Sequence, residues 1–293
     1  MFRENDGYCN MVVAEIDQAN LAKEFESPLL RMKNVTVWKG NSHPVRNLSL
    51  EIPQGRHTVI YGPNGSGKTS LIKLIMRDYY PVFHSEPPPV LEIFGRSEWN
   101  VFELRSDLGI VTADMDRYFL QWSAGITGLE AVLSGFFSSI GLSLHQPTTS
   151  EMKDRAINSL RWMEVEHLAQ KRLDHMSTGE IRRILISRAL VHDPRALLLD
   201  EPTTGLDVVS ARHFTNAIRR ITALGKTIIL VTHHLEEIIP EISYAVLLQE
   251  GSLFLEGSTE EVFTSENFTS LFRSPVIVSK RGDYYTAYSE QSR

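Results

Sequence analysis

The chain has 293 residues, of which 42% are hydrophobic and 23% are charged, ordinary values for a globular protein. No apolar run approaches the roughly 18 residues of a membrane-spanning helix, so we expect the chain not to span a bilayer. Its net charge of −6 gives no support to general nucleic-acid binding, which favours a basic surface. The single cysteine, Cys9, excludes an internal disulfide. Together with a start that lacks a secretory pattern, these features predict a cytoplasmic protein.

The chain divides into three predicted parts. Residues 1–28 form an acidic extension with a weak helical pattern near 11–25. Residues 29–273 carry every motif described below and are predicted to form one large domain. Residues 274–293 form a short C-terminal tail that Pro275 opens.

The pattern of apolar residues predicts alternating strands and helices in the large domain. Early strands are expected at 32–38, 48–52 and 58–61, followed by a helix over 70–78. Residues 114–190 are mostly helical in pattern. Two further strands, 195–199 and 227–231, flank a helix over 209–224, and a hairpin surrounds Glu250-Gly251. Buried strands between helices predict an α/β fold with a parallel sheet.

One motif predicts a phosphate site directly. Residues 62–69 match G-x-x-x-x-G-K-[ST], the glycine-rich loop that curls its backbone N–H groups around an anion. A strand leads into this loop and a helix follows it, so the helix N-terminus adds positive potential. Lys68 is predicted to reach the β- and γ-phosphates, and the Thr69 hydroxyl to ligate Mg²⁺. The predicted ATP-binding residues of this segment are Gly62, Pro63, Asn64, Gly65, Ser66, Gly67, Lys68, Thr69 and Ser70.

A second acidic motif completes the predicted site. The apolar run 196–199 ends in Asp200 and Glu201, where a buried strand would emerge. Adjacent strand residues face opposite ways, so the two carboxylates should have different roles. We expect Asp200 to hold Mg²⁺ and Glu201 to act as the base for the attacking water.

The segment Met176-Ser177-Thr178-Gly179-Glu180 allows the family to be recognised. With the two motifs above, it resembles the signature of the ATP-binding-cassette ATPases, usually Leu-Ser-Gly-Gly-Gln. Ser177 and Glu180 also have the spacing of a helix capping box, and both interpretations can hold. The resemblance covers residues 29–260. It implies a P-loop, RecA-like core with an N-terminal antiparallel β subdomain and an inserted helical subdomain over about 114–190.

The resemblance also implies further site residues. Asp207 resembles the dimer-contacting loop, and His233 the switch histidine that senses the γ-phosphate, with His234 as a competitor. Trp38 resembles the aromatic residue that stacks on adenine. The signature residues Ser177, Thr178, Gly179 and Glu180 would contact ATP held by the opposite protomer.

The sequence departs from the family pattern at two places. Ala113 stands where these ATPases usually carry a glutamine that contacts Mg²⁺ and links the ATPase to its membrane partner; Asp114 is a candidate substitute. Glu180, in place of glutamine, puts a negative charge near a polyanion. Residues 132–142 resemble a single-cassette subgroup named after iron-complex or molybdate transport. There, Phe136 and Phe137 either dock a membrane subunit or pack the helical subdomain.

The resemblance implies a Mg²⁺-dependent ATPase that dimerises around ATP, as a homodimer or with a homologous subunit. One hypothesis is the energising subunit of a membrane transporter for a metal or metal complex, held at the inner face of a membrane by a permease. The alternative is a soluble ATPase with a regulatory or assembly role. A DNA-repair or translation ATPase is disfavoured, and no nucleic-acid partner is expected. The arginines and lysines of 153–183, Arg182 among them, are expected on a solvated helical surface.

Overall fold

The computed structural model describes residues 27–83, 86–122, 125–141 and 146–289. The helical pattern near 11–25, and with it most of the predicted N-terminal extension, lies outside the described residues.

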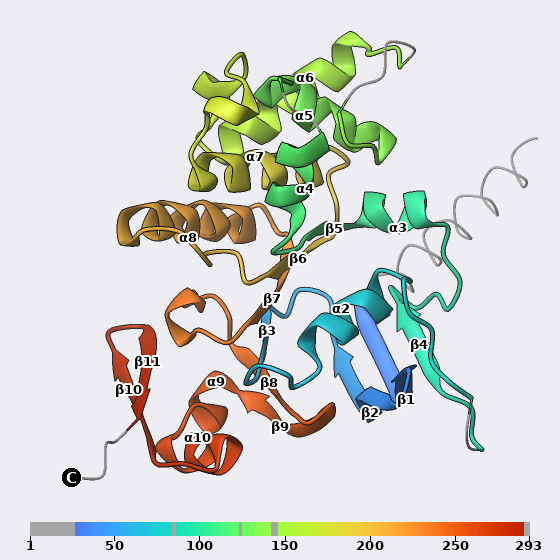
Figure 1. Ribbon diagram of the computed structural model, residues 1–293, viewed down its shortest axis with the longest axis vertical. Helices are drawn as coiled ribbons and strands as arrows, with labels where there is room; N and C mark the ends of the chain where they lie inside the picture. Colours follow the sequence, from blue (N-terminus) through green and yellow to red (C-terminus); the bar gives the residue numbers. More distant parts are fainter. Residues whose placement is uncertain (1–26, 84–85, 123–124, 142–145, 290–293) are drawn as a thin grey trace, which may run out of the picture.

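A six-stranded sheet forms the centre of the molecule (Figure 1). Its order is β5-β6-β7-β3-β8-β9; the first five are parallel and β9 runs antiparallel to β8. The strands are β3 (Thr58–Tyr61), β5 (Leu108–Val111), β6 (Ala196–Asp200), β7 (Thr227–Thr232), β8 (Tyr244–Gln249) and β9 (Ser252–Ser258). The predicted parallel sheet and the hairpin at Glu250-Gly251 are therefore confirmed.

The five parallel strands are buried on both faces of the sheet, which explains why they are apolar without alternation. In β6, Leu197 and Leu199 pack into the core on one face, and Ala196 and Leu198 into the core on the other. All four are fully buried. Truncating such a leucine to alanine typically costs about 2–5 kcal/mol, so the strand that ends in Asp200 is held firmly.

An antiparallel sheet covers one face of the centre, as the fold-class prediction requires. Its order is β2-β1-β4, with β1 (Leu30–Lys39), β2 (Ser42–Ile52) and β4 (Val90–Ile93). Helices α2 (Lys68–Ile75) and α3 (Val101–Asp107) lie on the same side and share its core. The backbone of Arg46 donates to Gly251, and that of Gly251 donates to Ser66, so this sheet and the β8–β9 turn brace the loop before α2.

The helical part lies on the other side of α8 (Val208–Ala223) from the sheet, at the top of Figure 1. It contains α4 (Met115–Trp122), α5 (Gly128–Leu133), the 3₁₀ turn η1 (Ser134–Phe137), α6 (Ser150–Trp162) and α7 (Thr178–Leu190). Short 3₁₀ turns at Glu166–Leu168 and Leu173–His175 connect α6 to α7. Side-chain caps fix the starts of several helices: Thr127, Thr149, Ser177 and Asp207 cap α5, α6, α7 and α8.

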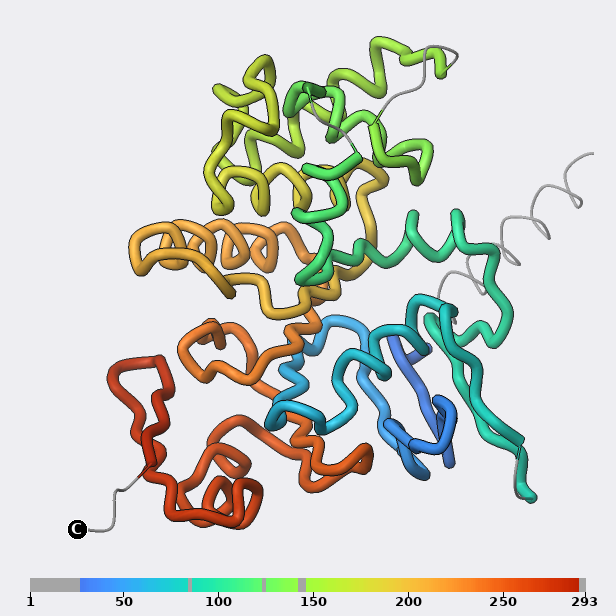
Figure 2. The backbone as a smooth tube through the Cα atoms, viewed as in Figure 1, coloured from blue at the N-terminus to red at the C-terminus, as the bar shows by residue number. Residues whose placement is uncertain are grey.

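The C-terminal segment packs on the main core. After the 3₁₀ turn η4 (Leu235–Glu237), α9 (Thr259–Val262) and α10 (Ser265–Phe272) lead to the hairpin β10 (Val276–Arg281) and β11 (Tyr284–Ser289). Tyr285 is buried with its ring centroid 5.0 Å from that of Phe263, and β11 contacts η4 (Figure 2). Within the described ranges, no helix has the length and apolar character to cross a membrane.

Candidate functional site

The glycine-rich loop joins β3 to α2 and leaves the start of α2 open. Gly67, the residue before the helix, has a φ of 104°, and a Cβ there would collide with the carbonyl oxygen of Pro44. It provides no side-chain cap, whereas Asp207 caps α8 with its carboxylate. The first N–H groups of a helix have no intrahelical acceptor. The loop therefore presents backbone donors and the positive end of a helix, an arrangement suited to an anion.

Lys68 is the first residue of α2, and its side chain folds back onto this loop. The side chain is buried, and its Nζ donates to the carbonyl oxygens of Gly62 at 2.6 Å and Pro63 at 3.1 Å. Burial lowers the pKa of Lys68, and the carboxylates of Glu201 and Asp200 counteract this. The buried Ser66 hydroxyl has no hydrogen-bond partner among the described residues. A polyanionic ligand would supply an acceptor for this hydroxyl and a counter-charge for this ammonium.

Asp200 ends β6 beside the loop. Burial, and then the charge of Glu201, raise its pKa to about 6, while a hydrogen bond from the Ala113 backbone and the charge of Lys68 act in the opposite direction. Asp114 also raises the pKa of Asp200, so this exposed carboxylate is in the electrostatic range of the site. A buried carboxylate destabilised in this way favours a cation next to it. Thr69, in the first turn of α2, offers a hydroxyl oxygen as well.

Glu201 and His233 are in direct contact. His233 Nδ1 lies 2.7 Å from Glu201 Oε1, and both side chains are about a quarter exposed. His234 stacks against His233 with ring centroids 3.9 Å apart, but the backbone N–H of His234 donates to Thr232. Of the two histidines, His233 is therefore the one that reaches the predicted base.

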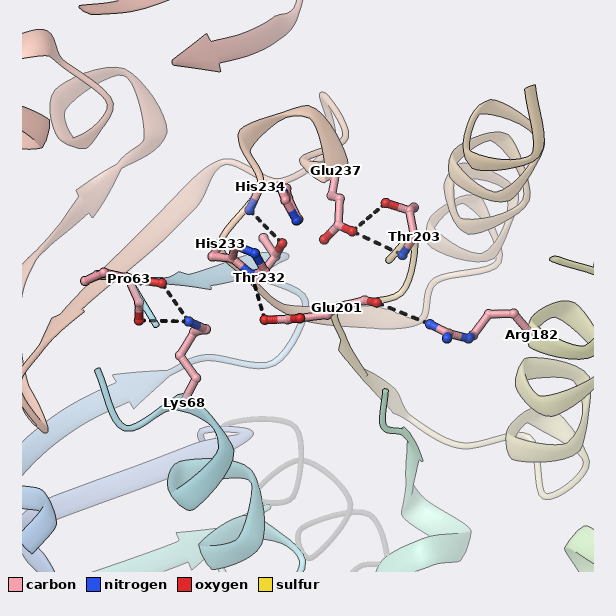
Figure 3. Close-up of polar contacts among 10 residues, drawn as sticks. Pro63, Lys68, Arg182, Glu201, Thr203, Thr232, His233, His234 and Glu237 are labelled. Atoms are coloured by element: carbon pink, nitrogen blue, oxygen red, sulfur yellow. Dashed lines mark hydrogen bonds and ion pairs between the residues drawn. The ribbon is translucent and has the colours of Figure 1, made fainter. Parts of the chain in front are cut away.

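The main chain of Glu201 and of the residues directly after it is held from two sides (Figure 3). The φ of Glu201, 45°, is unusual for a residue with a Cβ and costs roughly 1–2 kcal/mol. Arg182 Nη1 donates to the carbonyls of Glu201 at 3.2 Å and Pro202 at 3.1 Å. On the other side, Glu237 accepts hydrogen bonds from the backbone and the hydroxyl of Thr203.

Three of these supporting residues were not predicted as part of the site, and for Arg182 the prediction was wrong. Arg182 is only 2% exposed and pairs with Asp116 at 2.8 Å, instead of lying on a solvated surface. Arg182 lies on α7 between Ile181 and Leu185, which are both buried. These apolar neighbours are the one feature of the sequence that could have indicated a side chain pointing inward. Asp116 is 66 residues from its partner Arg182, and the buried Glu237 is 34 residues from its partner Thr203. No local sequence pattern therefore indicates either contact.

The signature segment starts α7. Ser177 Oγ accepts from the Glu180 backbone, and Glu180 Oε2 accepts from the Ser177 backbone at 2.7 Å, which confirms the capping box. The ammonium of Lys171 contacts both Glu180 oxygens at 3.0–3.1 Å. Burial raises the pKa of Glu180, but the Ser177 N–H and Lys171 outweigh it and hold the pKa below its usual value. The charge that replaces the family's glutamine is thus compensated internally.

Two other predicted site residues are Asp207 and Trp38. Asp207 accepts from the backbones of Val209 and Ser210 at the start of α8, and a Cβ on Gly179 would lie 3.4 Å from that of Ser210. The signature and the Asp207 loop are therefore neighbours. Trp38 is the second-last residue of β1, has 49% of its surface exposed, and its ring centroid is 5.2 Å from that of His43. An exposed indole at a strand end offers a flat apolar face.

A cleft of about 320 Å³ separates α3 and β5 from the helical part. We refer to it as the subdomain cleft. Phe136 packs at one side, with its ring edge-on to His192 at 5.2 Å, as the packing interpretation expects. Two arginines also line the cleft. Its lining includes Val101, Arg105, Ile110, Thr112, Met115, Tyr118, Phe119, Ile140 and Arg188.

Comparison with known proteins gives consistent matches. The family model described as "ABC transporter" matches residues 45–204. An uncharacterized ABC transporter ATP-binding protein of Bacillus subtilis, YlmA, is 31% identical over 252 residues, covering 85% of this chain and 93% of the relative. The manganese transport system ATP-binding protein MntB of the same organism is 28% identical, covering 83% and 92%.

Solved structures agree with the sequence matches. The chain superimposes with a TM-score of 0.69 on cbiO1 from Clostridium perfringens, described as part of the ABC transporter complex cbiONQ, at 25% identity. The match covers 84% of this chain and 94% of that one. A dimeric ATP-binding cassette bound to ADP and Pi gives a TM-score of 0.62 at 25% identity, covering 78% and 98%.

Proposed function

The chain belongs to the ATP-binding-cassette ATPases, and from that membership we propose how its residues bind and hydrolyse ATP to energise a membrane transporter. The observation that carries the proposal is the convergence of Lys68, Asp200, Glu201 and His233 at the carboxyl ends of β3, β6 and β7. In open α/β sheets, ligands bind at this edge of the strands.

ATP would bind with its triphosphate in the glycine-rich loop. The backbone donors at the start of α2 would bind the phosphate oxygens, and Lys68 would exchange its two carbonyl contacts for the β- and γ-phosphates. Trp38 would stack on adenine, which its exposed ring at the end of β1 allows.

Mg²⁺ fits the same place. Thr69 and Asp200 would hold it, and a cation there would offset the burial and the charge of Glu201 that raise the pKa of the partly buried Asp200 carboxyl to about 6. When bound, the cation would neutralise phosphate charge and draw the carboxyl of Asp200 into its ionised form. Few protein ligands are expected, since Mg²⁺ usually retains waters and binds substrate phosphates.

Glu201 is the proposed base that orients and deprotonates the attacking water. Its carboxylate contacts His233, which would hold it in place and also approach the γ-phosphate. Phosphoryl transfer needs mainly positioning and charge stabilisation from the protein. The fixed main chain of Glu201 supports such a positioning role.

The second half of each ATP site would come from a partner cassette. Ser177 accepts the Glu180 N–H through its oxygen, so its O–H proton remains for a phosphate oxygen of the nucleotide held by the other protomer. The Gly179 N–H would add a second donor, and Asp207 would lie at the dimer contact. Two cassettes would thereby enclose two ATP molecules.

A membrane subunit is the proposed partner of the subdomain cleft. The cleft is mostly apolar, and Val101, Phe102, Tyr118 and Trp122 on α3 and α4 are 40% to 68% exposed. Exposed apolar side chains gathered around a concave surface are typical of protein interaction sites. Such a partner would keep the chain at the inner face of a membrane. For the cargo, the manganese system relative supports a metal or metal complex.

The mass of the Glu201→Gln variant in solution tests this proposal. With Mg-ATP, we expect a shift from monomer to dimer, because the variant binds ATP but cannot discharge it. The exposed Glu98→Gln variant is the matched control and should turn over ATP without accumulating a dimer. Normal turnover by Glu201→Gln would remove Glu201 from the base role.

Co-purification from detergent extracts tests the membrane partner. A membrane protein that co-purifies with the chain supports the transporter, whereas dimerisation and turnover that never involve one would support a soluble regulatory ATPase.

A further inference from the structure

Arg182 connects the segment that follows β6 to helix α4. Its guanidinium Nη1 donates to the carbonyls of Glu201 and Pro202, and its Nη2 donates to Asp116 Oδ2 at 2.8 Å. Only 3% of the Arg182 side chain and 13% of the Asp116 side chain are exposed. A buried guanidinium needs a carboxylate to remain stable, so these two contacts depend on each other.

The contact at Glu201 acts on the residue's unusual backbone. Glu201 has a φ of 45°, its N–H donates to Val231 at 2.8 Å, and its carbonyl accepts from Arg182. The peptide planes on both sides are thereby fixed, and with them the direction in which the carboxylate leaves the main chain. Figure 3 shows the carboxylate facing His233 while the carbonyl faces Arg182.

The contact at Asp116 lies on a different element. Asp116 is in the first turn of α4, the helix that also contributes Met115, Tyr118 and Phe119 to the subdomain cleft. A displacement of α4 by an occupant of the cleft would therefore move the carboxylate that anchors Arg182. Rotation or translation of a short packed helix is an ordinary form of allosteric motion.

We propose that Arg182 is a positioning residue that, through Asp116, makes the orientation of the Glu201 carboxylate depend on the position of α4. The proposal rests on the role of Glu201 as the base given above. It makes the subdomain cleft a control point for the hydrolysis step rather than for ATP binding. The hydrogen bonds of Arg182 described above go to the segment of Glu201 and to Asp116, and not to the residues proposed to bind ATP, so a change at Asp116 should have little effect on nucleotide affinity.

Asp116→Asn is the first test, because it keeps the shape of the side chain and removes its charge. We expect kcat for ATP to fall at least tenfold while KM and the Kd of a fluorescent ATP analogue stay within twofold. Asp116→Glu, which retains the charge, should recover a large part of the rate. Arg161→Met breaks the exposed pair between Arg161 on α6 and Glu166 in the 3₁₀ turn after it, and is the control; its rate should match that of the wild type. Thermal unfolding of each variant checks that it is folded.

A double-mutant cycle separates a positioning role from a merely structural one. If Arg182 acts through Glu201, adding Asp116→Asn to Glu201→Gln should lower the residual single-turnover rate no further. An unchanged kcat in Asp116→Asn, a parallel loss of nucleotide affinity, or a multiplied loss in the double variant would overturn the inference. The wild-type ATPase rate is measured alongside. Its absence would overturn the proposed function instead, so the two failures are distinguishable.

Discussion

His233 Nδ1 and Glu201 Oε1 lie 2.7 Å apart, although the residues are 32 positions apart in the chain. The contact exists because β6 and β7 are parallel neighbours, paired from Ala196 with Thr227 to Asp200 with Val231. Residues that follow the two strands therefore emerge at the same edge. The contact with Glu201 distinguishes His233 from His234, whereas the sequence left both as candidates for the switch histidine.

Replacement of His233 should abolish rapid hydrolysis. Without the imidazole, the Glu201 carboxylate loses the partner that orients it, and we expect His233→Ala to lower kcat by about 10²–10³-fold, the loss typical of a removed electrostatic group. His234→Ala is the matched control and should change kcat less than threefold. Steady-state ATPase rates at saturating Mg-ATP check this. A larger effect at His234 would reverse the assignment.

Removal of the Asp200 charge should stabilise the protein while ending its activity. In the absence of Mg²⁺, burial raises the pKa of Asp200 from 3.8 to about 6, so the folded state binds more protons than the unfolded state between these values. The free energy of unfolding therefore falls as the pH rises from about 4 to 6 and stays lower above. Asp200→Asn has no such penalty, and at pH 7–8 it should be more stable by roughly 2–3 kcal/mol.

Urea unfolding in EDTA at two pH values measures this effect. The gain should be nearly absent at about pH 3, where Asp200 is mostly protonated in both states of the wild type. Addition of Mg-ATP should stabilise the wild type but have a much weaker effect on Asp200→Asn. A gain of equal size at both pH values would show that packing, and not the charge, is responsible.

The third prediction concerns the ion pair in which Lys171 compensates the negative charge of Glu180. Lys171→Met leaves the Glu180 carboxylate beside the position proposed for the partner's ATP. Repulsion between this carboxylate and the phosphates should weaken the ATP-dependent dimer about five- to tenfold. Sedimentation of the protein in the Glu201→Gln background provides the dimer Kd. Lys171→Met combined with Glu180→Gln should restore it, since the double variant is neutral at both positions; no recovery would argue against the electrostatic cause.

The parts of the site that the sequence predicted are those whose signals are local. The loop before α2, the end of β6 and the start of α7 each depend on a few adjacent residues, so the strand, turn and cap chemistry is visible in one short segment. The burial of Arg182 was not predicted, because a charged residue on a helix is usually exposed. Its burial depends on Asp116 and on two carbonyls, and these groups meet only in the folded chain.

Ala113 provides the last prediction. It stands where related ATPases usually have a glutamine, and its backbone N–H hydrogen-bonds Asp200, the proposed Mg²⁺ ligand. The side chain of residue 113 therefore begins close to the Asp200 carboxylate. Ala113→Gln should therefore place an amide within reach of the Mg²⁺ site and change kcat, or the Mg²⁺ concentration that gives half-maximal rate, by about threefold or more.

Ala113→Leu is the matched control, because leucine is similar in size to glutamine and has no oxygen to offer a hard cation. If both variants change the rate equally, the effect is steric. If neither does, a side chain at 113 does not face the Mg²⁺ site, and the metal-side oxygen must come from elsewhere, with Asp114 a candidate because its charge acts on Asp200.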